Sequence, residues 1–137
     1  MAAADFNGNG TPDLVWQNAG AVKVDYYNLV SGTPTYQSSA SLMPASGWTV
    51  RGAADMNGDG VPDLIWQNNT TGTVTVNFYG GAGGATYETY AWLQQGSGYN
   101  AWRVAAVADF DGNGTPDLVW QQINSPYAVT VNYYGPG

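Results

Sequence analysis

The chain opens on DFNGNGTPDLVWQ (residues 5–17), and the same pattern returns as DMNGDGVPDLIWQ (55–67) and DFDGNGTPDLVWQ (109–121). Each copy joins a loop rich in Asp, Asn and Gly to a short apolar segment. The copies begin 50 and 54 residues apart, a spacing typical of architectures that stack one supersecondary unit. We therefore expect a fold built from copies of one unit.

The segments between the loops predict antiparallel β-strands. The apolar segments at 14–16, 64–66 and 118–120 lead through a polar turn into alternating β-branched and aromatic residues at 22–26, 74–78 and 129–133. A weaker strand pattern lies near 35–37 and 86–90, and a fourth strand at 48–54 and 102–108, small and apolar in its second half, leads into the next loop. Four strands in about 50 residues fit one blade of a β-propeller.

The repeats predict an all-β fold, with a single repeat domain of about three four-stranded antiparallel blades. The blades are expected near residues 1–46, 47–100 and 101–137, with the first inner strand reduced to residues 1–4 and the third blade lacking its outer strand. Propellers typically have four to eight blades, so three blades cannot close a ring. We expect homo-oligomerisation, head to tail, with a dimer of six blades favoured and a trimer of nine as the alternative.

The composition excludes several functional classes. The chain has no Cys and no His, which removes disulfides, thiolate and imidazole metal sites and the usual catalytic triads. Its only basic residues are Lys23, Arg51 and Arg103, and no apolar run approaches the roughly 20 residues of a membrane span, so neither nucleic acid nor membrane is an expected partner. Outside the loops the only carboxylates are Asp25, interpreted as an ordinary exposed strand residue, and Glu88. We expect no enzyme.

The acidic residues gather in the repeated loops, which hold eight of the ten. Three divalent cations would reduce the net charge from −7 to −1. Calcium takes six to eight oxygen ligands, often from one short loop. The predicted ligands are the side chains at loop positions 1, 3, 5 and 9 and the carbonyl at position 7: Asp5, Asn7, Asn9, Asp13 and Thr11; Asp55, Asn57, Asp59, Asp63 and Val61; Asp109, Asp111, Asn113, Asp117 and Thr115.

These loops predict up to three Ca²⁺ ions per chain, with the weakest site in the first loop, which has two carboxylates where the others have three. An EF-hand is excluded, because its position 12 requires Glu and Trp stands there in all three copies. The alternative is a tight Asn/Asp/Gly turn without an ion, which the threefold repetition disfavours. Magnesium is less favoured because it usually keeps several waters.

The three loops resemble the FG-GAP/VCBS-type repeat, whose calcium loop reads D-x-[DN]-x-[DN]-G-x-x-D before an apolar strand. Integrin α-subunit propellers and a group of seven-bladed fungal and bacterial lectins use related blades. The resemblance implies a calcium-binding propeller of secreted or cell-surface origin. This chain departs from it in blade number and shows no signal peptide, a start typical of a trimmed or designed chain.

Two functions follow from the resemblance. The first is carbohydrate binding in pockets between blades, with aromatic candidates for sugar stacking at Trp16, Trp66 and Trp120, at Trp48 and Trp102, and at Tyr27, Tyr79 and Tyr134. Blade-to-blade packing is the alternative role for these side chains and is favoured for the Trp sets. The second is a non-catalytic structural or designed self-assembling scaffold, in which calcium only stiffens the loops. A glycan array would separate the two.

Overall fold

The computed structural model describes residues 1–96 and 98–135. Its regular elements there are strands, apart from two three-residue 3-10 helices, η1 (Ala82–Gly84) and η2 (Tyr99–Ala101). Within these ranges no helix has the length and apolarity needed to cross a membrane. The predicted all-β class is confirmed.

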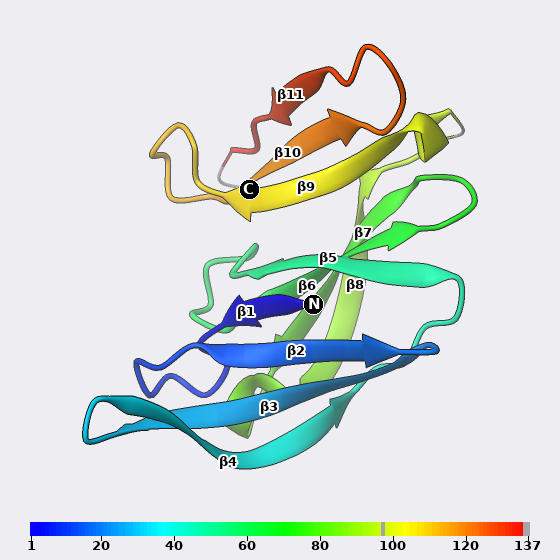
Figure 1. Ribbon diagram of the computed structural model, residues 1–137. Coiled ribbons are helices and arrows are strands. Elements are labelled where there is room, and N and C mark those ends of the chain that lie inside the picture. The colour runs from blue at the N-terminus through cyan, green and yellow to red at the C-terminus, as the bar shows by residue number, and fades with distance from the viewer. Residues whose placement is uncertain (97, 136–137) are drawn as a thin grey trace.

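The strands form three antiparallel sheets, one for each repeat, which we call blades 1, 2 and 3 (Figure 1). Blade 1 contains β1 (Ala2–Ala4), β2 (Asp13–Asn18), β3 (Ala21–Val30) and β4 (Thr33–Leu42). Blade 2 contains β5 (Trp48–Ala54), β6 (Asp63–Asn68), β7 (Val74–Gly80) and β8 (Thr86–Gln94). Blade 3 contains β9 (Trp102–Ala108), β10 (Asp117–Gln122) and β11 (Val129–Asn132), and the described part of the chain gives it no fourth strand.

The first strand of each blade lies on the inner side of the arc. Strand β5 contacts both β1 and β9, while the later strands of each blade extend away from them (Figure 1). Small residues permit this approach: a Cβ atom added to Gly52 in β5 would lie 2.5 Å from Val107 Cγ2 in β9. The small, apolar composition of these segments therefore reflects crowding at the axis of the propeller.

The hydrophobic core lies between the blades. Leu64 and Trp66 of β6 pack toward Val15 and Val24 of blade 1, whereas Ile65, between them in sequence, packs toward blade 3. Successive side chains of a strand point to opposite faces of the sheet, so one strand serves two interfaces. Blade 2 therefore buries both of its faces, as a propeller blade does.

A glutamine at the end of the repeated motif ties each blade to the next. Gln17 donates from Nε2 to the Trp48 carbonyl (2.7 Å) and accepts from the Val50 N–H (3.0 Å). Gln67 repeats this arrangement, with 2.9 Å to the Trp102 carbonyl and 3.3 Å from the Val104 N–H. The same pair of hydrogen bonds, from a Gln side chain to the backbone of the next blade, thus joins blade 1 to blade 2 and blade 2 to blade 3.

The interpretation of Asp25 as an exposed strand residue is wrong. Asp25 is buried, and its Oδ1 lies 2.8 Å from Lys23 Nζ. It occupies the middle of β3, opposite Leu14 of β2 and Ser39 of β4, so neighbouring strands cover it on both sides.

Candidate functional site

The three repeated loops coil because their side-chain oxygens accept hydrogen bonds from their own backbone. In the second loop Asp55 accepts from the N–H groups of Gly58 (2.7 Å) and Gly60 (2.8 Å), and Asp59 accepts from Val61 (2.8 Å). Gly58 and Gly60 have φ of 79° and 86°, which glycine adopts without the strain of a side chain. The oxygens of positions 1, 3 and 5 are therefore turned toward the inside of each coil.

The last Asp of each loop has a structural role that the sequence analysis missed. Asp63 is fully buried, and its two oxygens accept from the backbone N–H groups of Met56 (2.9 Å) and Tyr79 (3.0 Å). Asp13 and Asp117 repeat these two hydrogen bonds. The carboxylate thus joins the start of the loop to the end of the third strand. A Tyr at this place in every repeat was the available signal: Tyr27 in β3, Tyr79 in β7 and Tyr134 just after β11.

The third loop gathers carboxylate oxygens closely enough to surround a cation. Asp109, Asp111 and Asp117 offer oxygens that all lie within 4.8 Å of one another. Two ligands on opposite sides of a calcium ion are about 4.6–5.2 Å apart, so this donor set fits the ion. Across the described ranges no other three acidic side chains come so close together.

The amide and carbonyl candidates take up consistent positions. Asn9 and Asn113 donate from Nδ2 to the carbonyls of Tyr27 and Tyr134, both at 2.8 Å, while their Oδ1 atoms accept within the loop. In the second loop position 5 is Asp59, which accepts a hydrogen bond from the side chain of Asn57 at position 3 (2.9 Å). The residues predicted to offer a carbonyl, Thr11, Val61 and Thr115, end each coil and donate their N–H to the side chain at position 5.

Two carboxyl groups of the loops have shifted pKa values. Asp109 accepts hydrogen bonds from several backbone N–H groups, and these bonds lower its pKa; the bond from Gly114 has the largest effect. Burial raises the pKa of Asp63 to about 6, and the nearby Asp59 and Asp55 add to the effect. A cation in the loop would favour the charged form of both groups.

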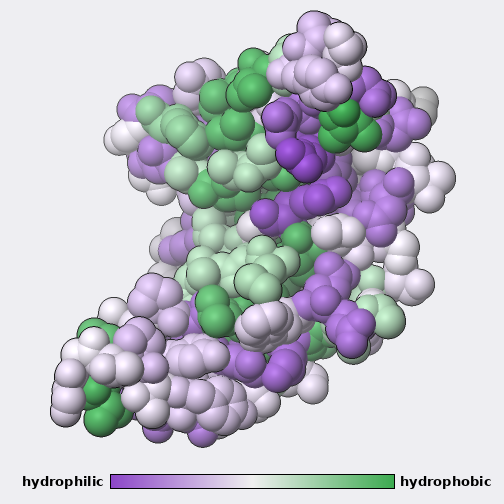
Figure 2. Space-filling model, viewed as in Figure 1, coloured by the Kyte–Doolittle hydropathy of each residue, from purple (hydrophilic) through white to green (hydrophobic). Residues whose placement is uncertain are grey.

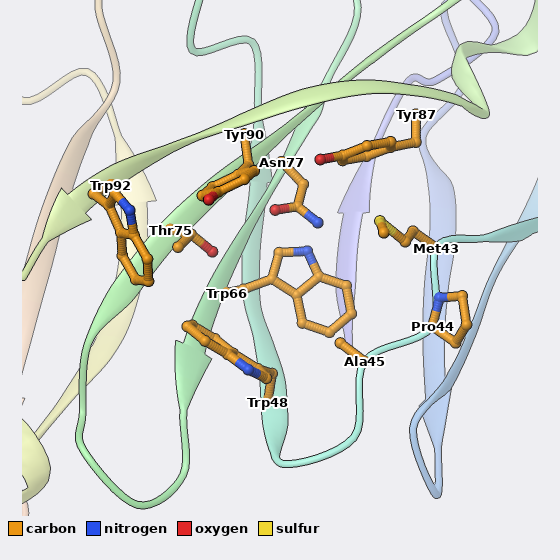
Figure 3. A pocket seen from close by; sticks show the side chains of 10 residues that line it. All are labelled: Met43, Pro44, Ala45, Trp48, Trp66, Thr75, Asn77, Tyr87, Tyr90 and Trp92. Atoms are coloured by element: carbon orange, nitrogen blue, oxygen red, sulfur yellow. The ribbon is translucent and has the colours of Figure 1, made fainter.

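A pocket of about 320 Å³ lies between the link from blade 1 to blade 2 and the outer half of blade 2 (Figure 3). Met43, Pro44 and Ala45 of the link form one side. Five aromatic side chains and two polar ones form the rest: Trp48, Trp66, Tyr87, Tyr90, Trp92, Thr75 and Asn77. The pocket therefore combines flat apolar faces with a few hydrogen-bonding groups.

The aromatic side chains of the pocket are arranged as a connected wall. Ring centroids are 6.3 Å apart for Trp48 and Trp92 and 5.9 Å apart for Tyr90 and Trp92. Figure 3 places Trp66 in the middle of the lining residues. Its indole Nε1 is buried and has no hydrogen-bond acceptor among the described residues. An unpaired buried donor is costly, and the equivalent Nε1 of Trp120, in the core between blades 2 and 3, is likewise buried without an acceptor.

The predicted sugar-stacking residues divide into three groups. Trp48 and Trp66 meet in the pocket. Tyr79, Trp102, Trp120 and Tyr134 pack in the core between blades, where burial raises the pKa of Tyr79 to about 12. Trp16 and Tyr27 lie in blade 1, on the face turned away from blade 2.

The sequence analysis missed Tyr87, Tyr90 and Trp92, which complete the pocket. All three belong to β8, and strand pairing places Tyr90 beside Asn77 and Trp92 beside Thr75. In blade 1 the same positions of the outer strand hold Ser39 and Ser41. The available signal was the pair Tyr90 and Trp92 in the outer strand of blade 2, which the outer strand of blade 1 replaces by Ser, whereas Tyr87 has a counterpart in Tyr36.

Comparison with known families gives a match to the FG-GAP-like repeat over residues 5–66 and again over residues 55–120. No similar curated protein and no similar solved structure was found. The two overlapping matches span the three loops and the blades between them, which confirms the resemblance that the loops suggested. The chain belongs to the FG-GAP-like repeat family.

Proposed function

We propose that this chain is a calcium-stabilised, non-catalytic propeller module that binds carbohydrate in the pocket between the link from blade 1 and the outer half of blade 2. The aromatic wall of Trp48, Tyr90 and Trp92 is the observation that carries the proposal. Sugar rings present apolar C–H faces that suit such a wall, and their hydroxyl groups suit the side chains of Asn77 and Thr75. The volume lies at the lower end of the range for small-molecule pockets.

Calcium has a structural role in this proposal. In the third loop the ion would be held by Asp109, Asp111 and Asp117, with Asn113 and the Thr115 carbonyl adding oxygens. The bound ion would supply positive charge that offsets the repulsion among the carboxylates. Extracellular calcium modules typically have dissociation constants of about 10⁻⁴–10⁻³ M, which suits the secreted or cell-surface origin that we propose.

A glycan array tests the proposed sugar site. The wild-type protein should bind a restricted set of glycans, and Trp92→Ala should weaken that binding about tenfold or more, equivalent to about 1.4 kcal/mol. Tyr127→Ala is the matched control, because Tyr127 is similarly exposed but lies outside the pocket. An array without wild-type binding, or an unchanged Trp92→Ala profile, would contradict the proposal.

The second candidate is a scaffold without a specific ligand. The observation that favours it is the absence of this aromatic pair from blade 1, where Ser39 and Ser41 replace Tyr90 and Trp92. A scaffold would gain stability from calcium and bind no glycan on the array.

A further inference from the structure

The two ends of the arc expose opposite halves of the interface that joins the blades. We call the face of a blade that packs on the following blade its front face, and the face that packs on the preceding blade its back face. Blade 2 buries both faces against its neighbours. Among the described residues, no further blade covers the front face of blade 3 or the back face of blade 1.

The front face of blade 3 repeats residues that blade 1 buries. Equivalent positions follow from strand pairing: Val22 pairs with Gln17, and Val129 pairs with Gln121, each at the end of its motif. The exposed fraction rises from 4 to 63 % between Val22 and Val129, from 9 to 63 % between Tyr26 and Tyr133, and from 2 to 52 % between Phe6 and Phe110. Figure 2 shows apolar residues reaching the surface at the blade 3 end of the molecule.

The back face of blade 1 repeats residues that blades 2 and 3 bury. Trp16 is 37 % exposed, whereas its counterparts Trp66 and Trp120 are 1 and 3 % exposed. Tyr27 and Tyr36 pack edge to face with centroids 6.1 Å apart and planes at 77°, the same geometry as Tyr79 and Tyr87 on the back face of blade 2. Blade 1 thus presents the surface with which blade 2 docks on its predecessor.

The charges on these faces permit close contact. The front-face residues named above are uncharged, and the only ions on the back face named here, Lys23 and Asp25, form a pair 2.8 Å apart. At the exposed edge Gln121 occupies the position from which Gln17 and Gln67 bridge to the following blade. Each exposed face therefore repeats one side of the interface that the chain already forms twice, between blades 1 and 2 and between blades 2 and 3.

We propose that a second copy of this chain seats the back face of its blade 1 on the front face of blade 3, head to tail. Because such a contact leaves both free faces present on the growing assembly, it ends only when rotation closes a ring. Two copies supply six blades, within the four to eight that propellers typically have, whereas three copies would supply nine. For the chain of residues 1–137, we therefore expect a closed dimer.

Light scattering coupled to size-exclusion chromatography tests this arrangement on the full chain in calcium buffer. The protein should elute with twice the protomer mass of 14.5 kDa. Val129→Asp on the front face and Trp16→Asp on the back face should each give monomers. Thr70→Asp is the control, because Thr70 is exposed in the turn between β6 and β7 of blade 2, the blade that has neither free face, and it should leave the dimer intact.

Mixing the two monomeric variants separates head-to-tail contact from a symmetric one. The mixture retains one native pair of faces, the front face of the Trp16→Asp protein and the back face of the Val129→Asp protein, and should recover a dimer. A monomeric wild-type protein, dissociation by only one of the two variants, or a mixture that stays monomeric would overturn the proposal. Should either variant lose its β-sheet circular dichroism, Tyr133→Asp and Tyr36→Asp probe the same two faces.

Discussion

At the scale of single residues, the buried Asp63 illustrates how one side chain can stabilise a loop without an ion. Asp63→Ala would leave the N–H groups of Met56 and Tyr79 without acceptors. A buried unpaired polar group costs about 1–3 kcal/mol, so we expect the free energy of unfolding to fall by about 3 kcal/mol even in EDTA. Urea denaturation measures it. Asp59→Ala, which removes an exposed carboxylate, is the control and should cost less than about 1 kcal/mol without calcium.

A second residue-scale prediction uses two loops that differ at a single position. The first reads DFNGNGTPD and the third DFDGNGTPD, so Asn7→Asp makes the first loop identical to the third and Asp111→Asn makes the reverse change. An added carboxylate strengthens attraction for calcium, so we expect about a tenfold gain at the first site and a similar loss at the third. Calorimetric titration reads both changes. If neither substitution alters its site, position 3 does not face an ion.

At the scale of the elements, the repeated glutamine should decide how firmly blades 2 and 3 are joined. Gln67→Ala removes the acceptor of the Val104 N–H and the donor to the Trp102 carbonyl, which should cost about 2–4 kcal/mol. Gln121→Ala is the matched control when both variants are made in the monomeric Val129→Asp background, where no second copy covers Gln121; its side chain hydrogen-bonds to Arg103 of its own blade, and its loss should cost less than about 1 kcal/mol. Urea unfolding of both variants gives the comparison, and equal losses would rule out an inter-blade role.

The strands show how far local pattern predicts structure. Alternation located β3, β7 and β11, because β-branched residues with period two are a property of the strand itself. The outer strand of blade 1 was expected only near residues 35–37 but spans Thr33–Leu42, since pairing with the long β3 extends a Ser-rich segment that has little strand signal of its own. Burial of Asp25 likewise depended on its neighbours across the sheet.

At the scale of the whole molecule, repetition predicted the fold class and the family. Three copies of one motif define where each blade begins, and that information is entirely local. The pocket could not be predicted in the same way, because Trp48 and Trp66 meet Trp92 only after the link from blade 1 has crossed beside blade 2. The side chains that differ between repeats, rather than those that recur, distinguish this pocket from the rest of the surface.

The separation of the pocket from the loops leads to a prediction about calcium and sugar together. No residue of the three predicted calcium loops lines the pocket, so calcium should stabilise the protein without touching the ligand. A site filled at 100 times its dissociation constant adds about 2.7 kcal/mol of stability, so EDTA should lower the melting temperature markedly. At a temperature where circular dichroism shows the EDTA-treated protein still folded, glycan affinity should stay within about threefold of its calcium value, a change of less than about 0.7 kcal/mol. Loss of sugar binding from a folded, calcium-free protein would mean that the ion is itself a ligand for the sugar, and that the pocket of blade 2 is not the site.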